Sequence, residues 1–302
     1  MSSPASRPAP AATQEARRLS AALATAWFAA ILGYVLHHLP PLRDHPVAGI
    51  AVALAAAAGL PLVVGRVVGR GAPYELPAVV VAPPSGPEIR TLSRSDLDFC
   101  AALHAHALPH GFFVALGPRF LRAYYETYIE SPHAVALSAT VSGHPIGYLV
   151  GVVNPTAHRT WVVRHAGIAL AIRGAIGLAV NPSAAYRFVR TRLTTYARSW
   201  RRGREGHGRE GRRNAAAMAV LTHVAVLPSG RGVGAGRRLV AAFETQARRR
   251  GASQGVLTTL GGAAGAGEFY AGLGWRRTAT RSNLDGRRVE EWTRALDGGD
   301  RQ

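Results

Sequence analysis

The sequence predicts an α/β protein with a central mixed β-sheet flanked by helices, preceded by two transmembrane helices. Apolar strand-like runs alternate with amphipathic segments from residue 88 onward, and a glycine-rich turn joins one such run to a helix near residue 230. Two long uncharged runs stand near the N-terminus. The chain is 48% hydrophobic and 18% charged, which excludes intrinsic disorder as a whole, and its single cysteine excludes a disulfide framework.

The N-terminal region divides into a tail and an apolar pair. Residues 1–18 are rich in Ala, Pro and Ser, and we expect them to be disordered. Residues 19–36 and 47–65 carry no charged side chain, and each run reaches the roughly 17–20 residues that a helix needs to cross a bilayer. We therefore expect a transmembrane hairpin over residues 19–70. A pair of buried, alanine-rich core helices is the alternative.

Arginines set the orientation expected for this hairpin. They flank its outer ends, whereas the short connection carries only Arg43 beside Asp44. By the positive-inside rule, both termini and everything after residue 70 then face the cytoplasm. The sequence thus predicts a multi-pass protein of the cell membrane with a cytoplasmic domain. The flanking residues are Arg7, Arg17, Arg18, Arg66 and Arg70.

Residues 71–87 have the composition of a proline-rich linker, and one domain is expected over residues 88–296. The first half of this domain should contain a strand, two helices and a hairpin. These elements are the strand 88–91, a helix capped by Ser93 or Ser95 and ending near Ala107, the helix 117–131, and the extended runs 134–141 and 145–153.

The second half begins with a basic insert over residues 155–213. After it we expect the strand 215–227, a helix to about Arg250, the strand 255–260, a helix that ends before Trp275, and one last strand. This alternation of strands and helices is the pattern of an α/β fold.

The glycine turn after strand 215–227 is the most informative segment. In VAVLPSGRGVGAGRRLV the glycines let backbone N–H groups surround an anion, and the helix that follows adds unpaired N–H donors and its dipole. A Walker A loop requires a lysine, which the chain lacks. A dinucleotide fingerprint requires glycine where Arg237 stands. The pattern Arg-x-x-Gly-x-Gly, which fits an acyl-CoA pyrophosphate loop, is satisfied by Arg231, Gly234 and Gly236.

A second segment, EFYAGLGW, follows, and its tyrosine, Tyr270, lies 34 residues after Gly236. Together the two segments resemble motifs A and B of the GNAT family of acyl-CoA-dependent N-acetyltransferases. The resemblance covers residues 88 to about 296 and is strongest over residues 220–277. It implies a GNAT-type mixed sheet, acetyl-CoA as co-substrate and no metal.

The resemblance also implies roles for individual residues. Val224 and Val226 match the strand whose backbone pairs with pantetheine and polarises the thioester carbonyl. Tyr270 matches the tyrosine that protonates the departing CoA sulfur, a role suited to a phenol. The turn whose amides hold the pyrophosphate is matched by Arg231, Gly232, Val233, Gly234, Ala235 and Gly236.

Other positions depart from the pattern or leave alternatives open. Many relatives have an asparagine where Ala263 stands, which puts one pantetheine contact in doubt. His223 is the candidate general base, although a histidine on a buried strand is more often a hydrogen-bonded core residue. Glu268 is a rival, and water or a neutral amine could replace both. We expect Trp275 and Cys100 to be core residues.

More than half of the net charge of +19 lies in the insert, where residues 159–213 hold thirteen arginines and two glutamates. Residues 166–180 form an apolar run with Arg173 at its centre, and residues 184–204 predict an amphipathic helix with tyrosine and tryptophan on its apolar side. Such a helix favours binding to an anionic membrane surface. An arm that closes over the active site is the alternative, and nucleic acid is disfavoured because no reading motif accompanies the charge.

The sequence therefore predicts a membrane-tethered N-acetyltransferase that moves an acetyl or another short acyl group from CoA to an amine by direct attack. The alternative is a non-catalytic acyl-CoA-binding sensor or scaffold at the membrane. The amine acceptor cannot be read from the motifs.

Overall fold

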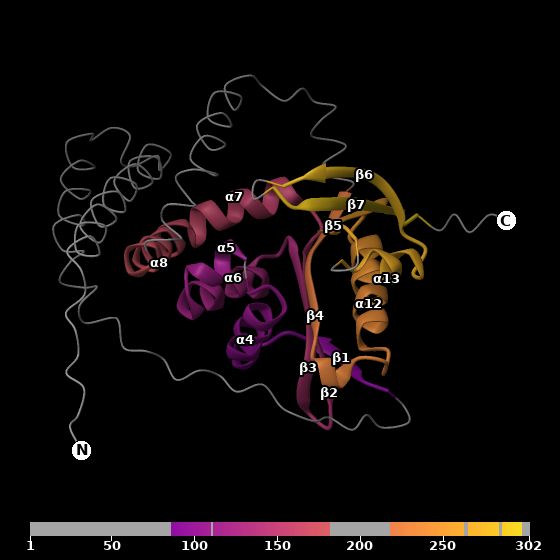
Figure 1. The fold of residues 1–302 in the computed structure, drawn as a ribbon, viewed down its shortest axis with the longest axis horizontal. Helices are drawn as coiled ribbons and strands as arrows, with labels where there is room; N and C mark the ends of the chain where they lie inside the picture. The colour runs from indigo at the N-terminus through magenta and orange to yellow at the C-terminus, as the bar shows by residue number, and fades with distance from the viewer. Residues whose placement is uncertain (1–85, 110, 182–217, 263–264, 284–285, 298–302) are drawn as a thin grey trace, which may run out of the picture.

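The computed structural model describes residues 86–109, 111–181, 218–262, 265–283 and 286–297. The expected tail, transmembrane hairpin and linker fall outside these residues, apart from the last two linker positions, and so does the second half of the insert. One twisted sheet forms the centre, with helices on both faces (Figure 1). Its strands are β1 (Glu88–Thr91), β2 (Ala134–Val141), β3 (His144–Val152), β4 (Met218–Val226), β5 (Gln254–Leu260), β6 (Arg276–Ser282) and β7 (Arg288–Ala295).

The helices include two short 3-10 turns, η1 (Arg94–Asp96) and η3 (Pro228–Gly230). The α-helices are α4 (Leu97–Ala107), α5 (Phe112–Ala115), α6 (Pro118–Glu130), α7 (Pro155–His165), α8 (Gly167–Val180), α12 (Ala235–Arg249) and α13 (Gly267–Ala271). Ser93 forms a capping box with Asp96, so of the two serines it is the cap.

The strand order β1-β2-β3-β4-β5-β7-β6 confirms a mixed sheet. β4 and β5 are parallel, and the other neighbouring strands are antiparallel. The prediction of one last strand was wrong, because the chain ends in the hairpin of β6 and β7. Every residue of β6 is exposed and several are arginine, so the strand lacks the alternation of polar and apolar residues that would reveal it.

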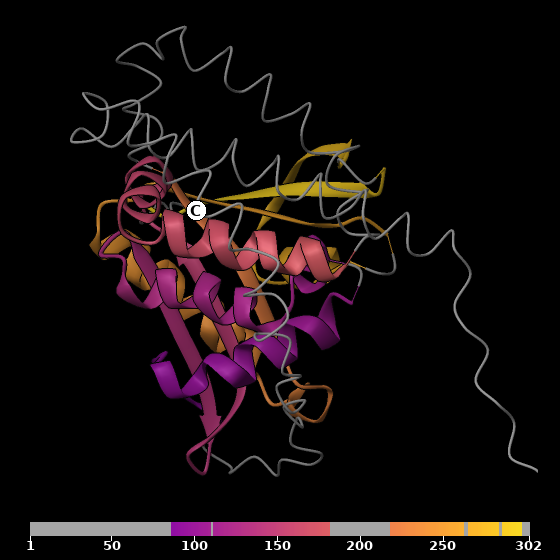
Figure 2. The ribbon, with the colours of Figure 1, turned by 90° about the vertical axis from the view of Figure 1, so that its left-hand side faces the viewer.

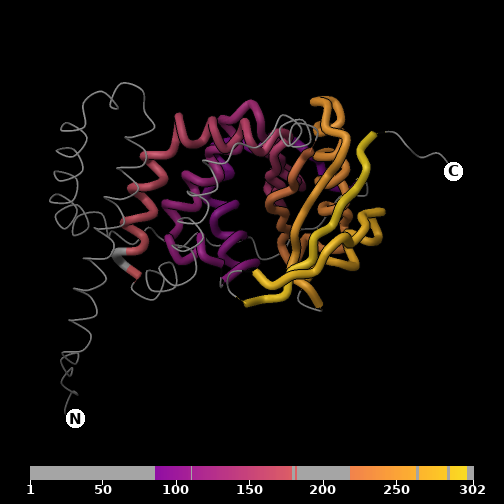
Figure 3. The backbone as a smooth tube through the Cα atoms, turned by 90° about the horizontal axis from the view of Figure 1, so that it is seen from above, coloured from indigo at the N-terminus to yellow at the C-terminus, as the bar shows by residue number. Residues whose placement is uncertain are grey.

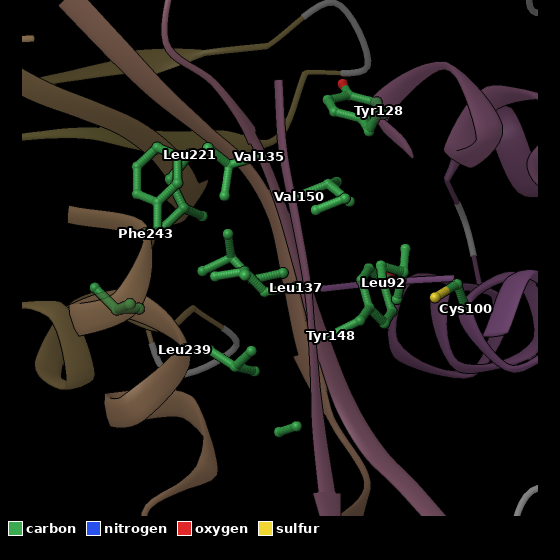
Figure 4. Close-up of a cluster of buried hydrophobic side chains, with 14 of the residues drawn as sticks. Leu92, Cys100, Tyr128, Val135, Leu137, Tyr148, Val150, Leu221, Leu239 and Phe243 are labelled. Atoms are coloured by element: carbon green, nitrogen blue, oxygen red, sulfur yellow. The ribbon is translucent and has the colours of Figure 1, made fainter. Parts of the chain in front are cut away.

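The buried core lies on both faces of the sheet (Figure 4). On one side, Leu221 of β4 faces Leu239 and Phe243 of α12. On the other side, Tyr148 of β3 lies near Cys100 of α4. Cys100 is fully buried, as expected, and burial raises the pKa of its thiol well above the ordinary value.

Two helices follow β3. The apolar run 166–180 is helical in α8, which packs Leu178 against Leu116 and Phe120. Helix α7 was not predicted, although Asn154 caps it by accepting a hydrogen bond from the Ala157 N–H at 3.0 Å and Pro155 occupies its first turn. Figure 2 looks onto the face that carries α4, α6 and α7, and Figure 3 shows α6 between α8 and the sheet.

Within the described part of the chain, no single helix has the length and hydropathy needed to cross a membrane. The pair α7 and α8 passes that test only when taken together, with a bend of 77° between the two helices.

A buried carboxylate connects α12 to the C-terminal strands. Glu244 is 4% exposed, and its Oε1 accepts hydrogen bonds from Trp275 Nε1 at 3.0 Å and from Arg294 Nη1 at 3.1 Å. Trp275 is therefore a core residue, as predicted. A buried carboxylate is stable only with such partners, so this contact fixes α12 against the end of the domain.

Candidate active site

The site is organised by a gap in the centre of the sheet. β4 pairs with β5 only over Met218–Leu221, opposite Gln254–Leu257. β4 then continues to Val226 with β3 as its partner, while β5 pairs with β7 to its end. The last residues of β4 therefore present one backbone edge that β5 does not cover.

The strand register identifies the residues on this edge. The N–H of Leu227 donates to the carbonyl of Ile146 at 2.8 Å, so Leu227 faces β3. Residues in an antiparallel pair alternate in the direction of their backbone groups. Val224 and Val226 consequently direct their N–H and C=O groups away from β3 and toward the gap. These are the two strand residues that the resemblance singles out.

The glycine turn lies just beyond this edge. Gly232 and Gly234 both have φ +83°, where a substituted residue is strained, and a Cβ on either would point into open space. The first backbone hydrogen bond of α12 runs from the N–H of Arg238 to the carbonyl oxygen of Gly234, at 3.0 Å. The backbone N–H groups of residues 232–237 have no acceptor in the part of the chain that the structure describes. Six neighbouring donors at a helix start form a site for an anion.

Helix α13 adjoins this turn on the face that carries α12 (Figure 1). A Cβ on Gly236 would lie 3.2 Å from the ring of Phe269, so that ring covers the turn. Tyr270 is 4% exposed and packs edge-on against Trp275. Burial raises the pKa of Tyr270, so its hydroxyl stays protonated at neutral pH, and no described group hydrogen-bonds to it.

Trp292 was not singled out from the sequence. It lies on β7 with its ring against Gly267 at the start of α13, where a Cβ would come within 3.1 Å of the indole. Its Nε1 is buried and has no hydrogen-bond partner among the described residues. A buried N–H without an acceptor is a donor that a ligand can satisfy.

A β-bulge aims two successive side chains of β4 at the opposite face. The register with β3 shifts between Val150 and Gly151, which leaves Thr222 as the extra residue of β4. The Thr222 side chain bonds to Tyr128, and Nε2 of His223 lies 3.1 Å from the hydroxyl of Tyr124. Both side chains thus face α6, immediately after the point where β4 leaves β5.

His223 is half-buried and belongs to a cluster with the buried His104 that the sequence did not indicate. The ring of His104 lies 5.0 Å from that of His223, and His104 Nδ1 lies 2.6 Å from the hydroxyl of Tyr125. Burial lowers the pKa of His104 to about 4, and burial together with His104 lowers the pKa of His223 to about 3. Both imidazoles are therefore neutral at neutral pH. The repeated tyrosines of α6, at Tyr124, Tyr125 and Tyr128, were the available signal.

The structure places the predicted residues in two groups. The turn and Tyr270 lie on the face of α12 and α13, whereas His223 lies on the face of α4 and α6, so the two catalytic candidates approach the gap from opposite sides. Arg231 and the rival Glu268 are exposed. Ala263 falls outside the described residues, and no set of metal-binding side chains occurs within them.

Comparison with known families gives one match. Residues 203–290 match the family model described as an acetyltransferase (GNAT) domain, which covers less than a third of the chain. The matched part contains β4, the glycine turn, α12, β5 and α13. No curated protein matches the sequence.

Solved structures give further similarities at low identity. A protein named SsHAT is 17% identical, with 70% of this chain and 98% of that chain covered and a TM-score of 0.47. A ribosomal-protein-alanine N-acetyltransferase from Brucella melitensis is 15% identical, with 69% and 99% covered and a TM-score of 0.43. An aminoglycoside 6'-N-acetyltransferase complexed with coenzyme A is 14% identical, with 69% and 97% covered and a TM-score of 0.41.

The neutral histidine pair predicts a loss of stability in acid. The folded pKa values of about 4 and about 3 lie below the unfolded value of about 6.5, so the unfolded chain binds more protons as the pH falls. The stabilisation is complete above pH 6.5 and is lost through pH 4. Between pH 7 and pH 5, urea unfolding should lose about 2 kcal/mol for each imidazole.

Burial also lowers the pKa of His158 to about 4, so three imidazoles contribute and in His223→Gln the pH dependence should fall by about a third. His144→Gln, which changes an exposed histidine, is the control and should keep the wild-type profile. An unchanged slope in His223→Gln would contradict the assignment of an imidazole that the folded protein keeps neutral.

Proposed function

We propose that the chain is a membrane-tethered N-acetyltransferase that transfers an acetyl or another short acyl group from CoA to an amine. The observation that carries this proposal is the run of six free N–H groups over residues 232–237, placed directly beyond the open edge of β4. The GNAT family match over residues 203–290 falls on the same segment. The free N–H groups of the turn suit a diphosphate, and the open edge of β4 suits an arm that contains amide groups.

Acetyl-CoA fits this arrangement as the co-substrate. The turn formed by Arg231, Gly232, Val233, Gly234, Ala235 and Gly236 would hold the pyrophosphate through main-chain amides. The open edge at Val224 and Val226 would pair with the amides of pantetheine, as an added strand does. An N–H on that edge can also polarise the thioester carbonyl. Trp292 supplies one more unpaired donor beside α13.

The chemistry requires two proton movements. The amine nitrogen attacks the thioester carbon, the C–N bond forms, and the C–S bond then breaks to release a thiolate. Tyr270 donates its phenolic proton to that sulfur and regains a proton from solvent. Burial that raises the pKa of Tyr270 also raises that of a thiolate held in the same pocket, so the transfer stays feasible.

We propose that His223 accepts the proton that the amine loses. With a pKa of about 3, its imidazole cannot hold a proton taken from a free alkylammonium ion, whose pKa is near 10. The acceptor therefore attacks as a neutral amine, and His223 receives its proton only after the C–N bond has formed. The hydroxyl of Tyr124, 3.1 Å from Nε2, orients the ring.

The membrane tether is supported by the two uncharged runs 19–36 and 47–65 and by the arginines at their outer ends. Both termini and the catalytic domain would lie on the cytoplasmic side. The full chain should therefore stay in the membrane fraction after alkaline carbonate extraction. A chain that lacks residues 19–70 should appear in the supernatant, and release of the full chain would refute the tether.

Gly234→Ala should weaken acetyl-CoA binding at least tenfold, because φ +83° strains a residue with a Cβ by roughly 1–2 kcal/mol and redirects the free N–H groups. Isothermal titration measures the change. Gly251→Ala is the matched control: Gly251 has φ +84° and open space at the other end of α12, so it carries the same strain outside the site. Equal affinities of the two variants would remove the turn from CoA binding.

Tyr270→Phe should lower turnover 10- to 1,000-fold while acetyl-CoA affinity changes little, because the hydroxyl acts on the sulfur only as it departs. Thiol release with a panel of amines measures turnover. An unimpaired variant would remove Tyr270 from the mechanism. Acetyl-CoA binding by the wild type without any acceptor-dependent thiol release would instead support the acyl-CoA sensor.

A further inference from the structure

A second concave site lies away from the sheet. A cleft of about 330 Å³ is formed where the start of α4 meets α6 and α8. Four guanidinium groups line it together with one carboxylate: Arg94, Arg119, Arg122, Arg173 and Glu126. Leu97 and Ala123, both buried, are the other lining residues. The lining is thus strongly cationic around a small apolar base.

The arginines of this cleft differ in their partners. Arg94 pairs with Glu126 at 3.3 Å and with Glu130, and Arg122 pairs with Asp98. Arg173 has no hydrogen bond or ion pair to any residue that the structure describes. The cleft therefore holds two guanidinium groups anchored by carboxylates and at least one that is free to bind an anion.

The position of Arg173 is not explained by packing. It stands exposed on α8, a helix whose other described residues carry no charge. The buried side of α8 is formed by Ala175 and Leu178. Gly174 is also close to the ring of Phe120, because a Cβ at this position would lie 3.5 Å from it. An exposed arginine in the middle of an apolar helix is instead suited to ligand contact.

The cleft is separate from the acyl-transfer site. Helix α6 stands between the two: Arg119, Arg122 and Glu126 face the cleft, whereas Tyr124 and Tyr128 on its other side contact β4. Figure 3 shows the same order, with α6 between α8 and the sheet. A ligand in the cleft would therefore leave the transfer site open.

We propose that this cleft binds the phosphate group of an anionic ligand. Guanidinium groups bind phosphate oxygens in paired, charge-assisted hydrogen bonds, and several converging arginines favour phosphate over a single carboxylate. The phosphate could belong to a soluble ester or to a lipid headgroup. Ile168 and Ile172, exposed one turn apart on α8 beside Arg173, offer an apolar surface for a lipid chain.

Isothermal titration of the full chain in a neutral detergent tests the proposal. The probes are glycerol 3-phosphate and dihexanoyl-phosphatidylglycerol, with dihexanoyl-phosphatidylcholine as the zwitterionic control. Arg173→Gln and Arg122→Gln should each weaken binding of the phosphate probe about tenfold, which is the loss expected for one charge-assisted hydrogen bond. Arg249→Gln, an exposed arginine at the end of α12, is the matched control and should bind as the wild type does.

Each outcome decides one question. Equal binding of both anionic probes assigns a soluble phosphate ester, and preference for the phosphatidylglycerol assigns a lipid headgroup. Binding of neither probe, or wild-type affinity in Arg173→Gln, overturns the proposal. Acetyl-CoA affinity of the same variants is measured in parallel and should not change, since the inference does not depend on the transfer site. If the wild type does not bind acetyl-CoA but binds the phosphate probe, the proposed function is refuted and the proposal for the cleft stands.

Discussion

The separation of β4 from β5 after Leu221 is the constraint on which the rest of the site depends. A parallel pair that stayed hydrogen-bonded to its end would use the backbone groups of Val224 and Val226 internally, and no extended ligand could reach them. Past this point β4 keeps β3 as its partner and β5 keeps β7, each on its other edge. The open edge of β4 follows from this division of the sheet, and the glycine turn comes directly after that edge in the chain.

The β-bulge at Thr222 extends the effect of that division to the other face. It places Thr222 and His223 toward the tyrosines of α6, while the backbone of the same strand faces the gap. Under the proposed function, this one strand supplies polar backbone to the acyl donor and a neutral imidazole to the amine. In the proposed reaction, the acyl donor and the amine meet at the strand without competing for the same groups.

Local patterns were enough to predict much of this from the sequence. The glycines that adopt positive φ can be read directly from the sequence, and the resemblance to the GNAT motifs singled out Val224 and Val226. Trp292, Tyr124 and the arginine cleft could not be predicted, because each depends on contacts between segments distant in the chain. β6 shows the opposite limit: all its side chains are exposed, and it pairs with β7 through backbone hydrogen bonds and the ion pairs Arg277–Glu290 and Arg281–Glu291, which leave no apolar periodicity.

The shared carboxylate of Glu244 has a consequence for the order of synthesis. Its partner Arg294 lies 50 residues further along the chain, so a nascent polypeptide carries α12 before the buried charge can be neutralised. Until then, burying the inner face of α12 costs the desolvation of an unpaired carboxylate. The glycine turn at the start of that helix therefore leaves the ribosome before the cation that neutralises the buried carboxylate of the same helix.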